Sequence, residues 1–479
     1  MDLHARYGGA SLLTGWLPLI VEFVALAMLL AVVARRSRHW WLVQVPTAVV
    51  VGVLCIALAF GYWDSSGIPS DAAPRMFWWW IGATGVTASL AVLGARRSGW
   101  GRRTLSVMAV ILTALATGLT LNQQIGYFPT INEALSQLTG STMASTEASL
   151  ETRRNTAGAN GTVVSISTGS ARSGFAHRAE YAYLPPAWFR GSTPPHLPAL
   201  MMIGGEFNTT ADWIRIGDAV ADADNYAHRH DGMAPILVFP DVSGHFGNDT
   251  ECVNGPRGQV TTHLLDEVRP YIVRRFGADS GGAGWGVAGF SMGGTCAVDL
   301  VTEHPDLFSA FDDIAGDAAP NAGDAVHTVK ALFGGDAAAY DDFNPETAMV
   351  RHGTYRDVYG WFDEAAAGSA HRAVSGNQTH PIATATYTGH VIEHTRSPQL
   401  AAARELCAEG VRVNIRCSIR VRPGGHTWQF AASAFRSGFA QLAQQLDTAP
   451  KAPSLRPLTI GYTERIGRPP GRWSRWSPA

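Results

Sequence analysis

Ser291 lies in a sequence that could present it as a catalytic nucleophile. It is the serine of GFSMGG, a GxSxG motif that directly follows an apolar run ending at Phe290. A serine on a sharp turn between a strand and a helix is exposed for attack on a carbonyl carbon. The flanking glycines allow the tight turn and leave room for an acyl group. The motif therefore predicts a nucleophilic serine.

His426 could supply the base that such a serine needs. A serine hydroxyl is a weak nucleophile at neutral pH, so an adjacent imidazole must take its proton. The chain has 16 histidines. His426, in PGGHTW, follows the last apolar run and comes after Ser291 in chain order, as this type of site requires. We therefore expect a Ser291–His426 pair.

The acid that orients His426 is expected at Asp363 or Glu364. Both follow the apolar run from Val358 to Phe362. Their side chains cannot both face the imidazole, because successive side chains of an extended segment point in opposite directions. Asp363 follows the run directly and is the commoner residue type, whereas Glu364 has the longer reach. Both stay candidates.

Backbone N–H groups should stabilise the negative charge that forms on the attacked carbonyl oxygen. We expect the amide of Met292, the residue after the nucleophile, and the amide of Glu206, in the loop after an earlier apolar run. Four further residues are predicted to line the substrate pocket: Phe207, Asp241, His245 and Trp428.

A competing metal motif occurs at residues 390–394. The sequence HVIEH fits HxxEH, in which two histidines bind zinc and the glutamate acts as a base. The segment is short, lies between Gly389 and Pro398, and falls where a triad enzyme would carry an insertion. We interpret it as a solvated turn and expect no metal centre.

Strand-like runs separated by segments long enough for helices must position these residues. The runs are Ala199 to Ile203, Pro235 to Phe239, Trp285 to Phe290, Phe308 to Ile314, Val358 to Phe362 and Val411 to Val421. This alternation predicts a doubly wound, mostly parallel α/β sheet with functional groups at the carboxyl ends of its strands. Val163 to Ser167 and Ala179 to Leu184 predict an antiparallel strand pair ahead of it.

The segment from about Val163 to Leu446 resembles the putative esterase family, which includes the S-formylglutathione hydrolases (esterase D) and the mycobacterial mycolyltransferases. The resemblance rests on GFSMGG at Ser291, PGGHTW at His426 and MIGGEF ending at Phe207. It implies an α/β-hydrolase fold and a serine esterase or acyltransferase without a cofactor or metal. Several actinobacterial members look similar in carrying apolar spans ahead of such a domain. The family's acid usually follows a glycine a few residues beyond the strand, whereas the run from Val358 to Phe362 leads directly into Asp363 and Glu364.

The first 125 residues are predicted to form four transmembrane helices. Their apolar stretches are Leu12 to Ala34, Leu42 to Phe60, Met76 to Gly94 and Thr104 to Leu121, each near the ~20 residues that cross a hydrocarbon core. The loops after the first and third stretches hold seven arginines, against two near the spans on the other side. Because arginine-rich loops stay in the cytoplasm, we expect a multi-pass protein of the cell membrane with its catalytic domain outside the cytoplasm.

The other segments complete the predicted organisation. Residues 126–160 are expected to form a linker, residues 161–446 the hydrolase domain and residues 447–479 a loosely ordered tail rich in proline and arginine. The 37 basic residues nearly balance the 39 acidic ones without forming a basic stripe, so nucleic acid is not an expected partner. Membrane lipid and a small-molecule, lipid or sugar ester are the expected partners.

The compartment determines what the five cysteines can do. Outside the cytoplasm disulfides persist, and we expect Cys252 to pair with Cys296 and Cys407 with Cys417. Cys55, within a span, should stay reduced. The alternative is that the four cysteines of the domain are small buried apolar residues.

The predicted triad indicates an esterase that works through an acyl-enzyme. An acyltransferase that moves an acyl chain onto a cell-envelope sugar would carry the same motifs, because the two reactions differ only in the acceptor. An inactive hydrolase fold used as a binding module is the third possibility.

Overall fold

The computed structural model describes residues 10–34, 37–65, 73–95, 99–132, 134–135, 158–190, 194–245, 247–366 and 398–446. The predicted tail, the HxxEH segment and most of the predicted linker lie outside these ranges.

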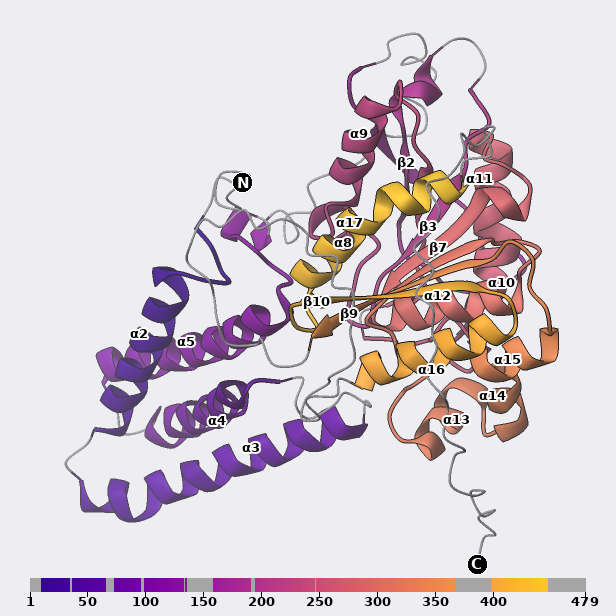
Figure 1. Cartoon of the computed structure of the whole chain (residues 1–479). Coiled ribbons are helices and arrows are strands. Elements are labelled where there is room, and N and C mark those ends of the chain that lie inside the picture. Colours follow the sequence, from indigo (N-terminus) through magenta and orange to yellow (C-terminus); the bar gives the residue numbers. More distant parts are fainter. Residues whose placement is uncertain are drawn as a thin grey trace, which may run out of the picture. The chain divides into compact units, whose positions relative to one another are not determined.

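Four long apolar helices form the first part of the chain, drawn in indigo and purple in Figure 1. They are α2 (Trp16–Val33), a π-helical turn η1 (Trp40–Gln44) continuous with α3 (Val45–Ser65), α4 (Arg75–Ala95) and α5 (Trp100–Ile125). Each is long and apolar enough to cross a membrane, as the sequence predicted. Glycines bring α3 and α4 into close contact, since a Cβ on Gly52 would lie 2.8 Å from the carbonyl oxygen of Gly82. Small residues at such contacts are typical of membrane helix pairs.

The second part is built on an eight-stranded sheet of order β1-β2-β4-β3-β7-β8-β9-β10. The strands are β1 (Thr162–Ile166), β2 (Glu180–Leu184), β3 (Ala199–Ile203), β4 (Ile236–Phe239), β7 (Trp285–Phe290), β8 (Ala310–Ile314), β9 (Tyr359–Ala366) and β10 (Arg416–Pro423). β1 and β2 are antiparallel to their neighbours, and the other six strands are parallel. A separate hairpin joins β5 (Asn254–Gly255) and β6 (Gly258–Gln259).

Helices cover both faces of this sheet (Figure 1). One face packs against α8 (Asp212–Arg215), α9 (Ala219–Arg229) and α17 (Trp428–Leu446). The other packs against α10 (Val260–Thr262), η4 (His263–Val268), α11 (Arg269–Phe276), α12 (Met292–Glu303), α15 (Pro345–His352) and α16 (Pro398–Arg412). The short elements η3 (Pro186–Phe189), η5 (Gly282–Gly284), α13 (Ala325–Phe333) and α14 (Ala337–Phe343) complete the domain.

Alternate strand residues supply the two cores. Val287 and Phe311 belong to the α12 side, whereas Ala288 and Ala310 belong to the α17 side, because successive side chains of a strand point to opposite faces. The architecture is therefore the predicted one, four apolar helices followed by a doubly wound, mostly parallel α/β-hydrolase sheet.

Two strand boundaries differ from the sequence prediction in a way that affects the site or its neighbouring helix. β10 begins at Arg416 because α16 continues through Arg412. β9 does not end at Phe362 but continues to Ala366, since β10 pairs with it along its whole length. Asp363 and Glu364 therefore lie within a strand rather than in the loop after it.

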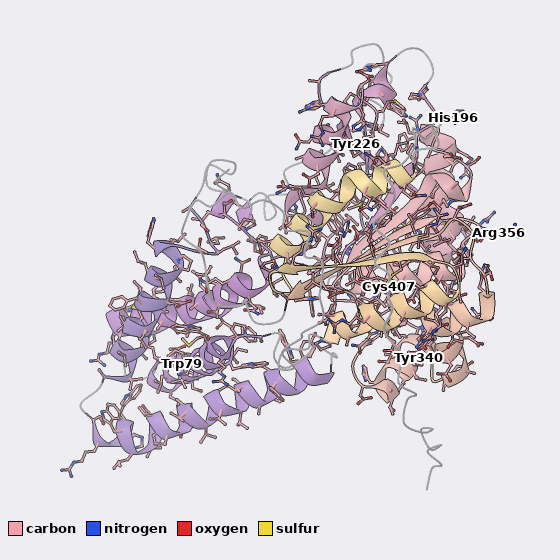
Figure 2. The ribbon with its side chains drawn as sticks, viewed as in Figure 1. Trp79, His196, Tyr226, Tyr340, Arg356 and Cys407 are labelled. Carbon is pink, nitrogen blue, oxygen red and sulfur yellow. A yellow bond between two sulfur atoms is a disulfide. The ribbon has the colours of Figure 1, made fainter. Side chains whose placement is uncertain are left out.

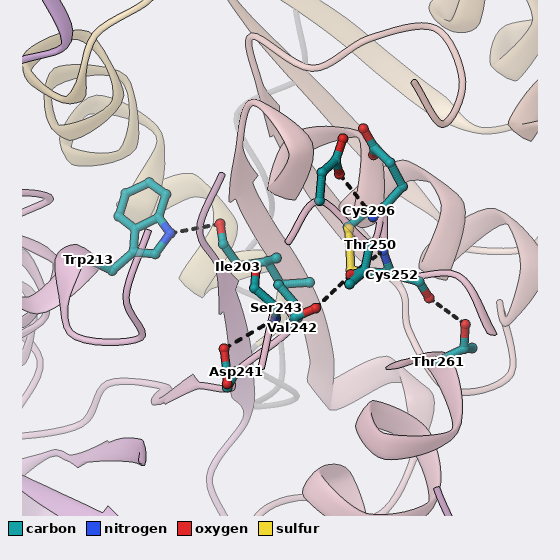
Figure 3. Close-up of a disulfide and its surroundings, with 11 residues drawn as sticks. Ile203, Trp213, Asp241, Val242, Ser243, Thr250, Cys252, Thr261 and Cys296 are labelled. Atoms are coloured by element: carbon teal, nitrogen blue, oxygen red, sulfur yellow. Dashed lines mark hydrogen bonds between the residues drawn. A yellow bond between two sulfur atoms is a disulfide. The ribbon is translucent and has the colours of Figure 1, made fainter. Parts of the chain in front are cut away.

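Two disulfides brace the domain. Cys252 is joined to Cys296 on α12, and Cys407 on α16 to Cys417 on β10, each with a Cα separation of 5.6 Å. Figure 3 shows the first bridge, where the hydroxyl of Thr261 donates to the carbonyl oxygen of Cys252. Figure 2 labels Cys407 of the second. Cys55 in α3 is free.

Candidate active site

Ser291 occupies a sharp turn between β7 and α12. Its φ of 59° and ψ of −124° lie in a region that residues with side chains rarely adopt, and such strain is common at catalytic positions. The Ser291 amide donates to the carbonyl oxygen of Ile314 on β8, at 2.9 Å. The glycines of the motif are required here, because a Cβ on Gly289 would lie 1.9 Å from the carbonyl oxygen of Gly293.

The structure brings His426 to Ser291. His426 lies between β10 and α17, and its Nε2 is 2.9 Å from Ser291 Oγ. If Nδ1 carries the ring proton, Nε2 can accept from the serine hydroxyl. The ring packs against Phe290, with the two ring centroids 4.9 Å apart. His426 keeps contact with solvent, but the surrounding protein lowers its pKa by desolvation, and the charge of Asp317 acts in the opposite direction.

Neither sequence-predicted acid hydrogen-bonds His426. Asp363 points to the α17 side, where it forms ion pairs with Arg420 and Arg422. Glu364 points to the α12 side and is fully buried, and neither carboxyl oxygen has a hydrogen-bond partner within the described part of the chain. Burial, reinforced by the charges of Asp313 and Asp363, raises the pKa of Glu364 to about 10.

Asp317 is the carboxyl group whose charge acts on His426, and sequence reasoning did not consider it. It lies in the turn after β8, whereas the two predicted acids lie on β9, the next strand along the chain. The sequence Asp313-Ile-Ala-Gly-Asp317 at the end of a buried run contained the signal, a tight-turn glycine followed by an acid.

The predicted oxyanion loop lies beside the nucleophile. A Cβ on Gly205 would be 3.1 Å from Ser291 Cβ, so a larger residue there would crowd the nucleophile. The loop is held by Asn208, whose Nδ2 donates to the carbonyl oxygen of Glu206 at 3.0 Å and whose Oδ1 accepts from Trp428 Nε1 at 3.0 Å. The Glu206 and Met292 amides thus belong to segments that border Ser291.

The four predicted pocket residues divide into two pairs. Phe207 is half-buried and His245 is exposed, so both can meet a substrate. Asp241 and Trp428 are fully buried, so they support the site from behind. Asp241 is ion-paired with Arg178 at 2.6 Å, and Trp428 packs on Phe290 as well as holding the oxyanion loop.

One cluster has ligand types suited to a metal ion. Atoms of His177, Glu180 and His263 lie within 4.8 Å of one another. His263 already contacts Glu180 through Nε2 at 3.0 Å and Glu267 through Nδ1 at 2.8 Å. These contacts satisfy both ring nitrogens without an ion.

Residues 177–371 match the family model described as Putative esterase. This match extends from β2 through β9 of the sheet domain. An uncharacterized protein of Corynebacterium glutamicum is 31% identical over 248 residues, which are 51% of this chain and 58% of that protein. The chain thus aligns with less than two thirds of this relative.

Solved structures with similarity to the domain include an S-formylglutathione hydrolase from Agrobacterium tumefaciens, with 17% identity and a TM-score of 0.44 over 60% of this chain and 97% of that one. MPT51 of Mycobacterium tuberculosis shows 15% identity and a TM-score of 0.42 over 59% of this chain and 98% of its own.

Proposed function

We propose that this esterase-family chain is a membrane-anchored serine esterase that works through an acyl-enzyme. The observation that supports this proposal most directly is the 2.9 Å contact between His426 Nε2 and Ser291 Oγ. Ser291 lies on a strained strand-to-helix turn, beside a glycine loop that can offer backbone N–H donors. A buried structural serine needs none of these features, whereas a nucleophile needs all of them.

The reaction follows from this geometry. Ser291 Oγ forms a bond to the ester carbonyl carbon while His426 Nε2 takes the hydroxyl proton, and the Met292 and Glu206 amides stabilise the oxyanion. The carbon–oxygen bond to the leaving alcohol breaks, and His426 returns its proton to that alcohol. Water then attacks the acyl-enzyme in the same way, which releases the acid and restores Ser291.

The proposed location is the cell membrane, with the catalytic domain outside the cytoplasm. The support is the four helices long enough to span a bilayer and the arginine excess in the loops after the first and third spans. The two disulfides fit an oxidising compartment. A substrate ester at the membrane surface would lie within reach of an anchored domain.

The exposure of His426 favours a second candidate, an acyltransferase. An acceptor larger than water, such as a sugar hydroxyl of the cell envelope, could reach the acyl-enzyme beside an exposed imidazole. Transfer and hydrolysis share every step up to the acyl-enzyme, so only the fate of the acyl group separates them.

The test uses the full-length protein in detergent micelles with short-chain and long-chain nitrophenyl esters, with and without a sugar acceptor. Free acid and acylated sugar are both measured, and Ser291→Ala is the matched control. Free acid at the same rate with or without sugar supports the esterase. Acylated sugar that forms at the expense of free acid favours the transferase, and nitrophenol release equal to that of Ser291→Ala would refute both.

A further inference from the structure

The imidazole of His426 has one nitrogen without an assigned role. Nε2 faces Ser291 Oγ, and no other hydrogen bond to His426 occurs within the described part of the chain. A base that takes a proton through Nε2 is held in the correct tautomer by a carboxylate near Nδ1, which also stabilises the imidazolium that forms. Such a carboxylate must carry a negative charge and must lie on the same side of the sheet edge as Ser291.

The two acids within β9 fail these requirements in different ways. Asp363 lies on the α17 side of the sheet, where its carboxylate forms ion pairs with Arg420 and Arg422. Glu364 is fully buried without a hydrogen-bond donor to its carboxyl oxygens among the described residues. Without water or a donor, its charged form is strongly disfavoured. A neutral carboxyl group provides no charge to stabilise an imidazolium.

The turn after β8 places a third carboxyl group, that of Asp317, beside α12, the helix that follows Ser291. Ala315 adopts φ of 55°, and the amide of Gly316 donates to Asp313 Oδ1 at 2.7 Å. A Cβ on Gly316 would lie 2.6 Å from the amide nitrogen of Thr295, so the turn passes directly over α12. The amide of Asp317 then donates to Thr295 Oγ1 at 3.0 Å. Thr295 is one helical turn from Ser291, and its own amide donates to the Ser291 carbonyl oxygen.

The surroundings of Asp317 suit a carboxylate. Asp317 is partly exposed, and its oxygens accept from Asn321 Nδ2 at 2.9 Å and Gln399 Nε2 at 3.4 Å. The titratable groups whose charges interact with it are His426, Asp249, Glu251, Asp313 and Glu364. Burial raises the pKa of each of these four carboxyl groups, to about 8 for Asp313 and about 10 for Glu364. Asp317 differs from these four carboxyl groups because it is accessible to solvent and accepts hydrogen bonds from two side-chain amides.

We infer that Asp317 is the carboxylate that orients His426 and stabilises its protonated form. It acts through His426 and not on the substrate, so it is a positioning residue. The long contact to Gln399, at 3.4 Å, is the weaker of its two side-chain bonds. This role requires that a rotation of the carboxylate, which gives up this bond, brings an oxygen to Nδ1 directly or through one water molecule when a substrate tightens the site.

The test compares Asp317→Asn, Asp363→Asn and Glu364→Gln in the full-length protein, with Asp324→Asn, an exposed helix cap, as the matched control. Asp317→Asn should lower kcat/KM about 10²- to 10⁴-fold, as loss of an orienting carboxylate does in serine proteases. Asp317→Glu should restore part of the loss. The pKa of His426 should fall, because a negative charge near it has been removed.

The pKa of His426 is measured without turnover, from the pH dependence of its carbethoxylation by diethyl pyrocarbonate, followed by peptide mass. This inference rests on the proposed function, but the titration still tests it if no ester is hydrolysed. An unchanged His426 titration in Asp317→Asn overturns the inference, whatever the activity. So does a kcat/KM within about threefold of wild type when Asp363→Asn or Glu364→Gln shows the large loss.

Discussion

His426 Nε2 and Ser291 Oγ lie 2.9 Å apart although 135 positions separate the two residues in the chain. Ser291 follows β7 and His426 follows β10, and two further strands lie between these in the sheet. The contact therefore forms only when the parallel strands from β7 to β10 are assembled in register. Ester turnover, if it depends on this pair, reports the integrity of that half of the domain.

Removal of either partner should abolish ester turnover. We expect Ser291→Ala and His426→Ala each to lower kcat by about 10⁴-fold or more, because nucleophile and base act as one unit. The thermal unfolding midpoint should stay near that of wild type, since His426 is exposed and the serine change removes one atom. Turnover above a few per cent in Ser291→Ala would contradict the assignment.

Glu364→Gln should make the protein more stable at alkaline pH. Burial, with the charges of Asp313 and Asp363, raises the pKa of this carboxyl from its ordinary 4.5 to about 10. Unfolding therefore releases a proton between these two values, so wild-type stability falls as pH rises through this range. Glutamine cannot ionise. The stability gain of the variant should vanish near about pH 4, grow as pH rises, and be largest at about pH 10 and above.

Chemical unfolding of Glu364→Gln at several pH values measures this gain. Glu346→Gln, an exposed position at the start of α15, is the matched control and should show no such dependence. A gain that is the same at every pH would mean that Glu364 is not held protonated in the folded protein.

His263→Gln should destabilise the protein most in mildly acidic solution. Burial alone would lower the pKa of His263, but the hydrogen bonds and charges of Glu180 and Glu267 outweigh it and raise the pKa. The stabilisation by charged His263 is complete below its ordinary pKa of 6.5 and is lost as pH rises through the raised value. For Glu267, hydrogen bonds from Ser173 and His263 outweigh burial and lower the pKa to about 2. The stabilisation of the fold by charged Glu267 is therefore lost as pH falls from 4.5 toward that value.

The difference in unfolding midpoint between wild type and His263→Gln should therefore peak at about pH 5 to 6 and shrink on both sides. Thermal melts across the pH range measure it, with the exposed His228→Gln as the control. A difference that grows steadily above about pH 8 would show that His263 is neutral in its pocket.

Four of the five cysteines should resist alkylation until the protein is reduced. The unfolded protein is treated with an alkylating reagent before and after reduction, and its peptides are weighed. We expect Cys55 alone to react before reduction, and linked peptides that contain Cys252 with Cys296 and Cys407 with Cys417, as the Cα separations of 5.6 Å allow. Reaction of all five without a reductant would show that the bridges do not form in the cell.

A protease added to intact cells should cut the chain after Asn122 and leave the loops that follow the first and third spans uncut. The reason is the arginine excess of those loops, which places them in the cytoplasm. Immunoblots with tags in each loop and in the domain read the result. Protection of the whole domain until the membrane is opened would reverse the proposed orientation.

The sequence by itself determined the elements whose signals are local. Four apolar stretches set the number of long helices, since length and hydropathy are properties of a continuous segment. Gly289, Gly293 and Gly294 set the turn at Ser291, because a Cβ at each of these positions would clash with neighbouring atoms. His426 could be chosen from 16 histidines because its place after the last strand is a property of chain order.

The tertiary structure decided which carboxyl group can serve His426. β10 pairs with β9 through Pro423 and Ala366, and this pairing draws Asp363 and Glu364 into the strand, one toward Arg420 and the other into the core. The same assembly buries Asp241 and Trp428 behind the oxyanion loop and carries Asp317 over Thr295. These outcomes depend on partners supplied by distant segments, so the charge and contacts of each acid are fixed only when neighbouring strands and helices exclude water from it.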